Sequence, residues 1–498
     1  MPRPPLRVLA SGLLMAAASL ATAQTGSLKG LTKMEGKPPG GADKLLALRN
    51  GTLRTSGPEL SAADLKANQD LLRAVAKHHV YKVTEDKYYL QPESGDLKPR
   101  DTSATFDQVL LDVTNQILQP GPETKFSTAQ QGYINELGAA LNDAIRDVLK
   151  TNPPAPVRVN TGRLLALAAK SGAPALAPTV HELLTNAFPL DKGKPAKTPP
   201  ELLLYAVRAA GNLFAAYDPV WHLNTDWRSQ FRHGFAEKDQ IALARDLLTL
   251  LDKGPGVGEL AAVGEPDKAV VRPVQLDPVA DKPAAPAEVA APPEQTQVTA
   301  YYRRAVAAAV SKIRPDQVGE IGQPPLYPGL AIAKLATGDG TLKPGVTTPE
   351  VADAVVGLCC VAPTANLNLP EVLGAIAAGG RTLAQNYNTR KSDPVVGRHA
   401  QLVAWKLYAE RLNAACDHLT RQAGQNPRWR DQRAAVGLLV GILRDDLVTP
   451  FRRDDGTAPA SAERLAEFVR NRAALPAAER SLYTNDPAFL LTPRQAGP

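Results

Sequence analysis

Apolar residues recur at intervals of three and four along most of the chain, and this spacing is typical of amphipathic helices. Residues three or four apart lie on one face of an α-helix, so each apolar stripe marks a face that another element covers. One stripe consists of Phe106, Val109, Leu110, Val113 and Ile117. A longer stripe consists of Ile134, Leu137, Leu141, Ile145 and Val148. The pattern predicts a succession of helices from residue 103 onward.

Capping residues divide this pattern into separate helices. Ser61 with Asp64, and Ser127 with Gln130, have the spacing of a capping box at a helix start. The segment 81–90 fits either a short hairpin or an extended loop, and the sequence does not decide between them. In the second half of the chain, helices are expected near residues 301–313, 349–361, 370–386, 395–424, 429–447 and 461–474.

The composition favours helices over sheets. Hydrophobic residues make up 44% of the 498-residue chain, but aromatic residues make up only 5%, so Leu, Ala and Val must fill the core. Sheets are enriched in β-branched and aromatic side chains, whereas Leu and Ala are strong helix formers. We therefore expect an all-α fold.

A Pro-rich segment at residues 254–299 interrupts the helical pattern. It contains no aromatic residue, and its seven acidic residues outnumber its three basic ones. Such a segment buries too little apolar surface to offset the entropy lost on ordering, so we expect a flexible acidic linker, rich in Pro and Ala. It divides the body into an N-terminal helical half, 61–253, and a C-terminal half, 300–475. Residues 24–60 are expected to form a mostly disordered basic arm, and residues 476–498 a loose tail.

Residues 152–187 combine a proline turn with two Leu-rich helices. The turn ends in Pro156-Val157-Arg158, a break follows at Ala173-Pro174, and the second helix carries Leu183 and Leu184. This unit resembles a HEAT repeat. Related proline starts occur at Thr198, Asp393 and Asn426. The resemblance implies antiparallel helix pairs stacked in an α-solenoid, an architecture that offers extended binding surfaces.

The first 23 residues have the pattern of a secretory signal peptide. Arg3 and Arg7 form a short positive region before an uncharged apolar run from Val8 to Leu20, and Ala21-Thr22-Ala23 is a small-x-small cleavage site. We expect cleavage after Ala23 and a secreted or periplasmic protein, exported by a Sec-type route. The run is shorter than the roughly 20 residues that a membrane-spanning helix needs, and no later stretch comes closer, so no transmembrane anchor is expected.

The net charge and the cysteines narrow the classes of partner. The formal charge of +7 includes Arg3 and Arg7 and is spread over a mixed surface, so nucleic acid is not an expected partner. The three cysteines are interpreted as small buried hydrophobes. Their spacing also leaves open a disulfide between Cys416 and either Cys359 or Cys360.

The best candidate for a binding segment runs from Phe214 to Phe235. It gathers aromatic rings, carboxylates and guanidinium groups of the kind that bind sugars or peptides. The candidate site residues are Tyr217, Trp221, His222, Asp226, Trp227 and Arg228. The same segment also fits a long loop that folds back over helix ends, and the sequence leaves both interpretations open.

Motifs for catalysis and for metal binding are weak. The histidines and carboxylates lack the spacing of a metal site, and no nucleophile elbow, zinc-protease motif or phosphate-binding loop occurs. No cofactor or metal is expected. We expect an exported, non-enzymatic helical-repeat scaffold that binds a protein or an envelope polymer. The alternative is an envelope-acting hydrolase or lyase that uses Asp218, Asp226 or His222 as acid and base.

Overall fold

The computed structural model describes most of the chain. The described residues are 33–37, 40–53, 61–85, 106–115, 128–187, 197–216, 220, 236–253, 293–315, 318, 326–338, 346–361, 367–454, 461–473, 481–483 and 486–490. Within these ranges the regular secondary structure is helical, apart from two short strands and an isolated bridge between Val318 and Leu326. The expected all-α fold class is confirmed.

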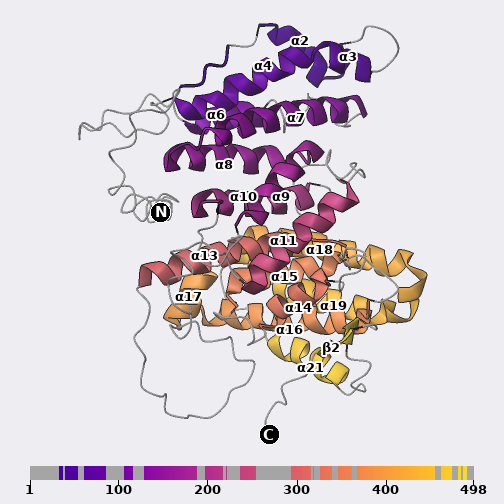
Figure 1. Cartoon of the computed structure of the whole chain (residues 1–498). Helices are drawn as coiled ribbons and strands as arrows, with labels where there is room; N and C mark the ends of the chain where they lie inside the picture. The colour runs from indigo at the N-terminus through magenta and orange to yellow at the C-terminus, as the bar shows by residue number, and fades with distance from the viewer. Residues whose placement is uncertain are drawn as a thin grey trace.

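The N-terminal helices form successive layers of the molecule (Figure 1). The α-helices are α2 (Ala42–Arg49), α3 (Ala62–Ala67), α4 (Gln69–Val80), α6 (Phe106–Val113), α7 (Thr128–Lys150), α8 (Ala155–Ala169), α9 (Ala177–Thr185), α10 (Pro200–Ala215) and α11 (Glu237–Lys253). Short 3-10 turns follow α4, as η1 (Tyr81–Thr84), and precede α9, as η4 (Pro174–Leu176). The layers α4, α7, α8 and α10 lie one beneath another in Figure 1.

The C-terminal helices form the lower part of the molecule in Figure 1. They are α13 (Pro293–Val310), α14 (Pro328–Thr337), α15 (Thr348–Cys360), α16 (Leu369–Thr389), α17 (Pro394–Ala400), α18 (Trp405–Gln425), α19 (Arg433–Leu443), α20 (Thr449–Arg453) and α21 (Ser461–Ala473). A 3-10 turn, η7 (Pro427–Gln432), precedes α19, and a π-helical turn, η8 (Arg444–Val448), joins α19 to α20. Strands β1 (Ser481–Tyr483) and β2 (Asp486–Leu490) pair antiparallel.

Three described elements fall where the sequence predicted little order. Helix α2 lies in the expected disordered arm, and its Leu48 is fully buried in the core. Helix α13 begins at Pro293, inside the expected linker, whose residues 254–292 lie outside the described ranges. The pair β1–β2 lies in the expected loose tail. Helix α2 contacts α7, α13 contacts α10, and β1 contacts α16, and composition alone did not predict these contacts.

Three local predictions, namely the two capping boxes and the form of the segment 81–90, can be compared with the structure. The Ser61 hydroxyl accepts a hydrogen bond from the Asp64 N–H at 3.2 Å, and the Asp64 carboxylate accepts one from the Ser61 N–H at 2.9 Å, so the first capping box is confirmed. Ser127 of the second box is outside the described residues. The described part of 81–90 is the 3-10 turn η1, which is neither of the two predicted forms.

Helices α8 and α10 run parallel and pack closely. The guanidinium of Arg158, early in α8, lies 2.6 Å from the Glu201 carboxylate, early in α10. Near the other ends, the Asn212 side chain donates a hydrogen bond to the Ala166 carbonyl at 2.7 Å. Residue numbers rise together along the two helices, so both run in the same direction.

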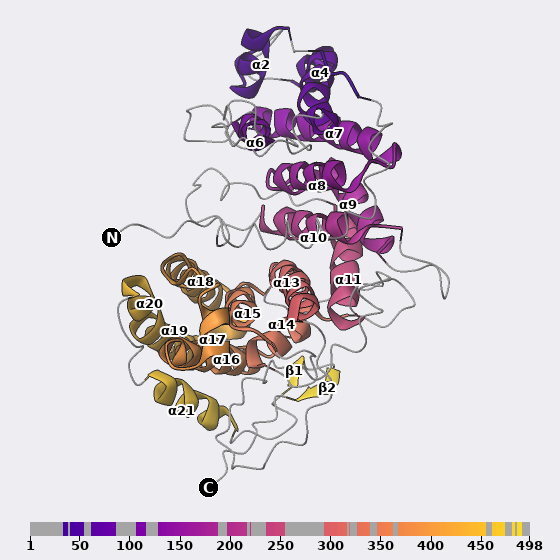
Figure 2. The same cartoon turned by 90° about the vertical axis from the view of Figure 1, so that its left-hand side faces the viewer.

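Helix α13 continues this row on the other side of α10. The Arg208 guanidinium donates a hydrogen bond to the Tyr301 hydroxyl, and Gly211 lies against Ala309, so α13 is again parallel to α10. A Cβ at Gly211 would lie only 3.0 Å from the Ala309 Cβ, so glycine permits the close approach of the two helices. Figure 2 shows α8, α10 and α13 at successive levels of the molecule.

A second row of helices packs beside the first. Helix α15 packs on α13, while α9, α11, α14 and α16 form contacts with one another in chain order. The buried apolar residues of both parts belong to a single core cluster that includes Leu213 of α10 and Val306 of α13. The two predicted halves are therefore joined by direct packing as well as by the chain.

The three cysteines lie in this core and are free thiols in the structure. Cys359 and Cys360 end α15, and Cys416 lies on the neighbouring α18. Burial raises the pKa of both the Cys359 and the Cys416 thiol, the latter to about 12. This burial agrees with their interpretation as small hydrophobes, and thiols held in the protonated form are poor nucleophiles.

Candidate functional site

The candidate site predicted from the sequence falls almost entirely outside the described residues. Those outside include every proposed binding and acid–base residue, namely Tyr217, Asp218, Trp221, His222, Asp226, Trp227 and Arg228. Phe214 is buried at the end of α10, and Val220 is buried in the core. The described structure therefore directs attention to two other hollows of the surface.

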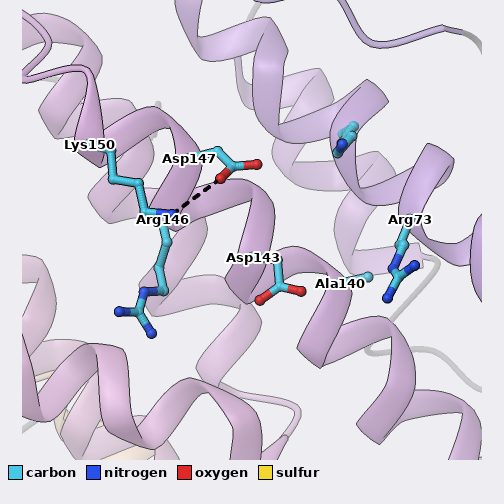
Figure 3. Close-up of a pocket in the computed structure, with 7 residues that line it drawn as sticks. Arg73, Ala140, Asp143, Arg146, Asp147 and Lys150 are labelled. Atoms are coloured by element: carbon cyan, nitrogen blue, oxygen red, sulfur yellow. Dashed lines mark ion pairs between the residues drawn. The ribbon is translucent and has the colours of Figure 1, made fainter.

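The first hollow is a charged groove beside α4 and α7, with a volume of about 430 Å³, which we call the α4–α7 groove (Figure 3). Its lining residues are Arg73, Lys77, Ala140, Asp143, Arg146, Asp147 and Lys150. Most of them follow one another at helical spacing along α7, and Arg73 comes from α4 on the opposite side of the groove in Figure 3.

The charges of the α4–α7 groove are largely matched by neighbours. The Lys150 amine lies 3.6 Å from the Asp147 carboxylate, which also accepts a hydrogen bond from the Tyr81 hydroxyl at 3.1 Å. Arg146 lies 3.4 Å from Glu182. These pairs are well exposed to solvent, where such interactions contribute about 0–1 kcal/mol. The groove is thus a solvated polar surface with little excess charge to offer a ligand.

The second hollow lies where the N-terminal layers meet α13, and has a volume of about 570 Å³. We call it the junction cleft. It crosses α8, α10, α13 and α15, and small residues leave its interior open, among them Ala166, Gly211 and Ala309. Its charged lining residues are Arg163, Lys170, Arg208, Arg304, Lys312 and Asp353. The described part of the lining therefore contains five cationic side chains and one carboxylate.

Helix periodicity places these cations on one side of the row of helices. Arg163, near the middle of α8, and Lys170, at its C-cap, are seven residues apart and lie on the same face of the helix. Arg304 on α13 and Lys312, two residues beyond its end, both line the same cleft. Because α8, α10 and α13 are parallel, these faces adjoin and concentrate positive charge in a single cleft.

The outer part of the junction cleft combines guanidinium groups with aromatic rings. The Arg208 guanidinium lies 5.4 Å from the centre of the Tyr205 ring and 5.5 Å from that of Tyr301. Arg163 lies 2.5 Å from the Asp107 carboxylate, which is 79% exposed and therefore well hydrated. Stacked guanidinium groups keep their hydrogen-bonding edges available in a fixed geometry, which suits recognition of planar anionic groups.

The inner part of the junction cleft contains a partly desolvated lysine and carboxylate. Burial lowers the pKa of Lys312 to about 8, and the pKa of the Asp353 carboxyl is raised by the same cause. The Arg411 guanidinium of α18 lies 3.7 Å from Asp353 and opposes the second of these shifts. The Arg304 guanidinium donates a hydrogen bond to the Leu402 carbonyl at 3.2 Å.

One pair of titratable groups elsewhere has the composition of an acid–base dyad. His181 Nδ1 on α9 lies 2.6 Å from the Asp246 carboxylate on α11, and burial raises the pKa of Asp246 to about 6. This pair joins adjacent helices and lines neither of the two hollows. Among the described residues, no group of three metal-binding side chains occurs.

Sequence reasoning did not find the junction cleft. The signal available was the repeated seven- or eight-residue spacing of cations on α8 and α13, which in isolation is typical of a solvated helix face. Those faces come together only because α13 packs against α10, although residues 254–292 lie between the two helices in the sequence. No periodicity in the sequence predicts that contact.

Comparisons with known proteins add no family. No family model, curated protein or solved structure matches the chain. Across the described ranges, none of the helices combines the length and the apolar character needed to span a bilayer.

Proposed function

We propose that the protein is an exported, non-enzymatic HEAT-like scaffold that binds an anionic protein or envelope polymer in the junction cleft. The observation that carries this proposal is the excess of five cationic side chains over one carboxylate among the described residues that line the cleft. An excess of one sign of charge in a cleft with low-dielectric walls attracts ligands of the opposite sign.

The order of helix contacts supports a HEAT-like arrangement. Helices α8, α10, α13 and α15 pack on one another in chain order, and α9, α11, α14 and α16 form a second row beside them. This is the arrangement expected of stacked helix pairs, in which each pair contacts the next. The junction cleft crosses all four members of the first row, so it fits an extended ligand that lies across the stack.

The lining of the junction cleft supports binding over catalysis. General acid–base chemistry requires two titratable groups that converge on a substrate. Among the residues that the structure describes, Asp353 is the single carboxylate in the lining, which includes neither a histidine nor a cysteine. The enzymatic alternative therefore still rests on the segment Phe214 to Phe235.

Export is the part of the proposal that rests on the sequence alone. The first 23 residues have the pattern of a signal peptide, with cleavage after Ala23. An exported protein meets anionic polymers and acidic protein surfaces in the cell envelope, and a cationic cleft suits either. Intact mass of the protein recovered from the envelope tests this step, because cleavage leaves Gln24 as the first residue.

A comparison of two charge-neutralised variants tests the binding function. The double variant Arg163→Gln, Arg208→Gln removes two cations from the junction cleft. The matched control Arg146→Gln, Lys150→Gln removes two from the α4–α7 groove. Charged hydrogen bonds contribute about 1.5–3 kcal/mol each. The cleft variant should therefore bind about tenfold or more weakly to immobilised polyglutamate and to purified envelope polymer, and the control should bind as the wild type does.

The two immobilised ligands also separate the classes of partner. Retention on polyglutamate alone indicates an acidic protein, and retention on envelope polymer alone indicates that polymer. Equal binding by the cleft variant and the wild type on both supports would contradict the proposal. Melting curves followed by circular dichroism show whether each variant is folded.

A further inference from the structure

We infer that the inner end of the junction cleft is a subsite for a phosphoryl group, formed by Lys170, Arg304 and Lys312 around Asp353. The inference rests on the proposed function, because it names the chemical group that the cleft takes. It assigns the deep part of the cleft to one anionic group, and leaves the outer part, with Arg208 and its aromatic neighbours, to the remainder of the ligand.

The Lys312 amine lies at the inner end of the cleft. The Lys312 Nζ lies 3.7 Å from the point that a Cβ would occupy at Gly211, so its amine extends from the end of α13 across the face of α10. Lys170, at the C-cap of α8, is close enough to Lys312 to lower its pKa. The two amines therefore face the same part of the cleft from helices on either side of α10.

Positive charge predominates among the described side chains at the inner end of the cleft. Lys312, Arg304 and Arg411 act on Asp353, and Lys170 acts on Lys312. The Glu350 carboxylate also acts on Asp353, but it forms an ion pair with Arg303 at 2.8 Å. Helices α8 and α13 end close by, and each C-terminus adds a partial negative charge of about one half. Among the described residues, the cationic side chains that line this end outnumber the carboxylates, which suits the two negative charges of a phosphoryl group better than the one charge of a carboxylate.

The type of side chain agrees with this charge. Lysine amines act as point charges on phosphate oxygens, and guanidinium groups donate pairs of hydrogen bonds to them. Lys312 also loses solvation in the cleft, and an oxyanion beside it would favour its charged form. In the α4–α7 groove, by comparison, the Arg146 and Lys150 side chains lie 3.4 Å and 3.6 Å from exposed carboxylates.

Calorimetric titration of the full chain with inorganic phosphate at pH 7 tests the subsite. We expect saturable binding by the wild type and at least a tenfold loss of affinity in Lys312→Met, which keeps the apolar stem but removes the charge. Lys312→Arg should retain binding within a few fold. Lys391→Gln, an exposed lysine on the turn after α16, is the control and should match the wild type. Acetate should bind to none of them.

Two results would overturn the inference. One is the absence of phosphate binding by folded wild type, and the other is equal affinity in wild type and Lys312→Met. Because removal of a buried charge relieves desolvation, Lys312→Met should fold, and its melting curve verifies this. A sugar phosphate compared with inorganic phosphate separates the sources of the group, since only a larger ligand should lose affinity when Arg208→Gln is introduced.

The failure of this inference can be told from failure of the proposed function. If Lys312→Met loses phosphate but keeps polymer retention, the subsite exists and is not needed for the partner. If Arg163→Gln, Arg208→Gln leaves polymer retention unchanged while the wild type binds phosphate through Lys312, the subsite stands and the scaffold function in the cleft does not.

Discussion

The Arg208 guanidinium on α10 donates a hydrogen bond to the Tyr301 hydroxyl on α13 and lies 5.5 Å from the centre of that ring. These residues are 93 positions apart in the chain and belong to the two predicted halves. Near them Gly211 lies against Ala309. The contact between the halves is therefore specific in geometry, and it positions the two sides of the junction cleft.

We predict that the two halves stay associated after the chain between them is cut. The trypsin site at Lys268 lies between α11 and α13, in the segment expected to be a linker, whereas Arg272 and Lys282 each precede a proline and resist trypsin. Limited digestion should give two helical fragments that elute together from a size-exclusion column, because α10 and α13 share one core. Separation of the fragments without denaturant would contradict the shared core, and early cuts within α7 or α18 would contradict the expected linker.

We predict that Gly211→Ala destabilises the protein. The new Cβ would lie 3.0 Å from the Ala309 Cβ and 3.1 Å from its Cα, so α10 and α13 must move apart. Overpacking of this kind costs about 1–3 kcal/mol in free energy of unfolding. The control Gly437→Ala lies on α19, where a Cβ meets nothing within 4 Å, and it should stabilise the protein by up to about 1 kcal/mol. Urea denaturation measures both, and equal effects would argue against close packing at Gly211.

We predict opposite effects of pH on stability and on phosphate affinity through Lys312. Its folded-state pKa of about 8 lies below its ordinary value of 10.5. Between these two values the unfolded chain holds the proton more firmly than the folded protein, so the contribution of Lys312 to the free energy of unfolding rises with pH. Below about pH 8 the amine is charged in both states and adds no pH dependence.

Phosphate affinity should fall over the same range, because the neutral amine no longer attracts an oxyanion. The charged groups that face Lys312 are Lys170, Asp353 and Arg411, and the pKa of Asp353 is raised by burial from a low ordinary value. The difference in urea stability between wild type and Lys312→Met, followed from pH 7 to 10.5, isolates the lysine from other titrating groups. A difference that does not change with pH would refute this assignment.

The double variant Trp221→Ala, Trp227→Ala tests the aromatic segment. If the two rings form a binding platform, loss of both should weaken binding to the envelope polymer by about tenfold or more and leave helical content nearly intact. If they cover helix ends, each truncation should cost about 3 kcal/mol or more and lower the melting temperature sharply. A large loss of stability with no specific loss of binding would remove the segment as a site.

The helices were predictable because their signal is local. All five apolar residues of the stripe from Ile134 to Val148 are buried along α7, as a period of 3.6 requires. The capping box at Ser61 was readable for the same reason, since its partners are three residues apart. The box formed by Thr347 and Glu350 at the start of α15 has the same spacing and was overlooked.

The junction cleft was not predictable because the residues that line it are far apart in the sequence. On α8 alone, Arg163 and Lys170 look like members of a hydrated face, and their importance appears only when α13 packs beside α10. The order of α2 was missed for a related reason. Its sequence is poor in amphipathic pattern, yet Leu48 reaches the core beside α7.

The single core through α10 and α13 has a consequence for how the molecule melts. In an array of helix pairs, stability is close to a sum of individual units and the interfaces between neighbours. The weakest interface decides whether the array unfolds in one transition or in two. With Gly211 and Ala309 in tight contact, heat should unfold both parts together, and loosening that one contact should divide a single calorimetric peak into two.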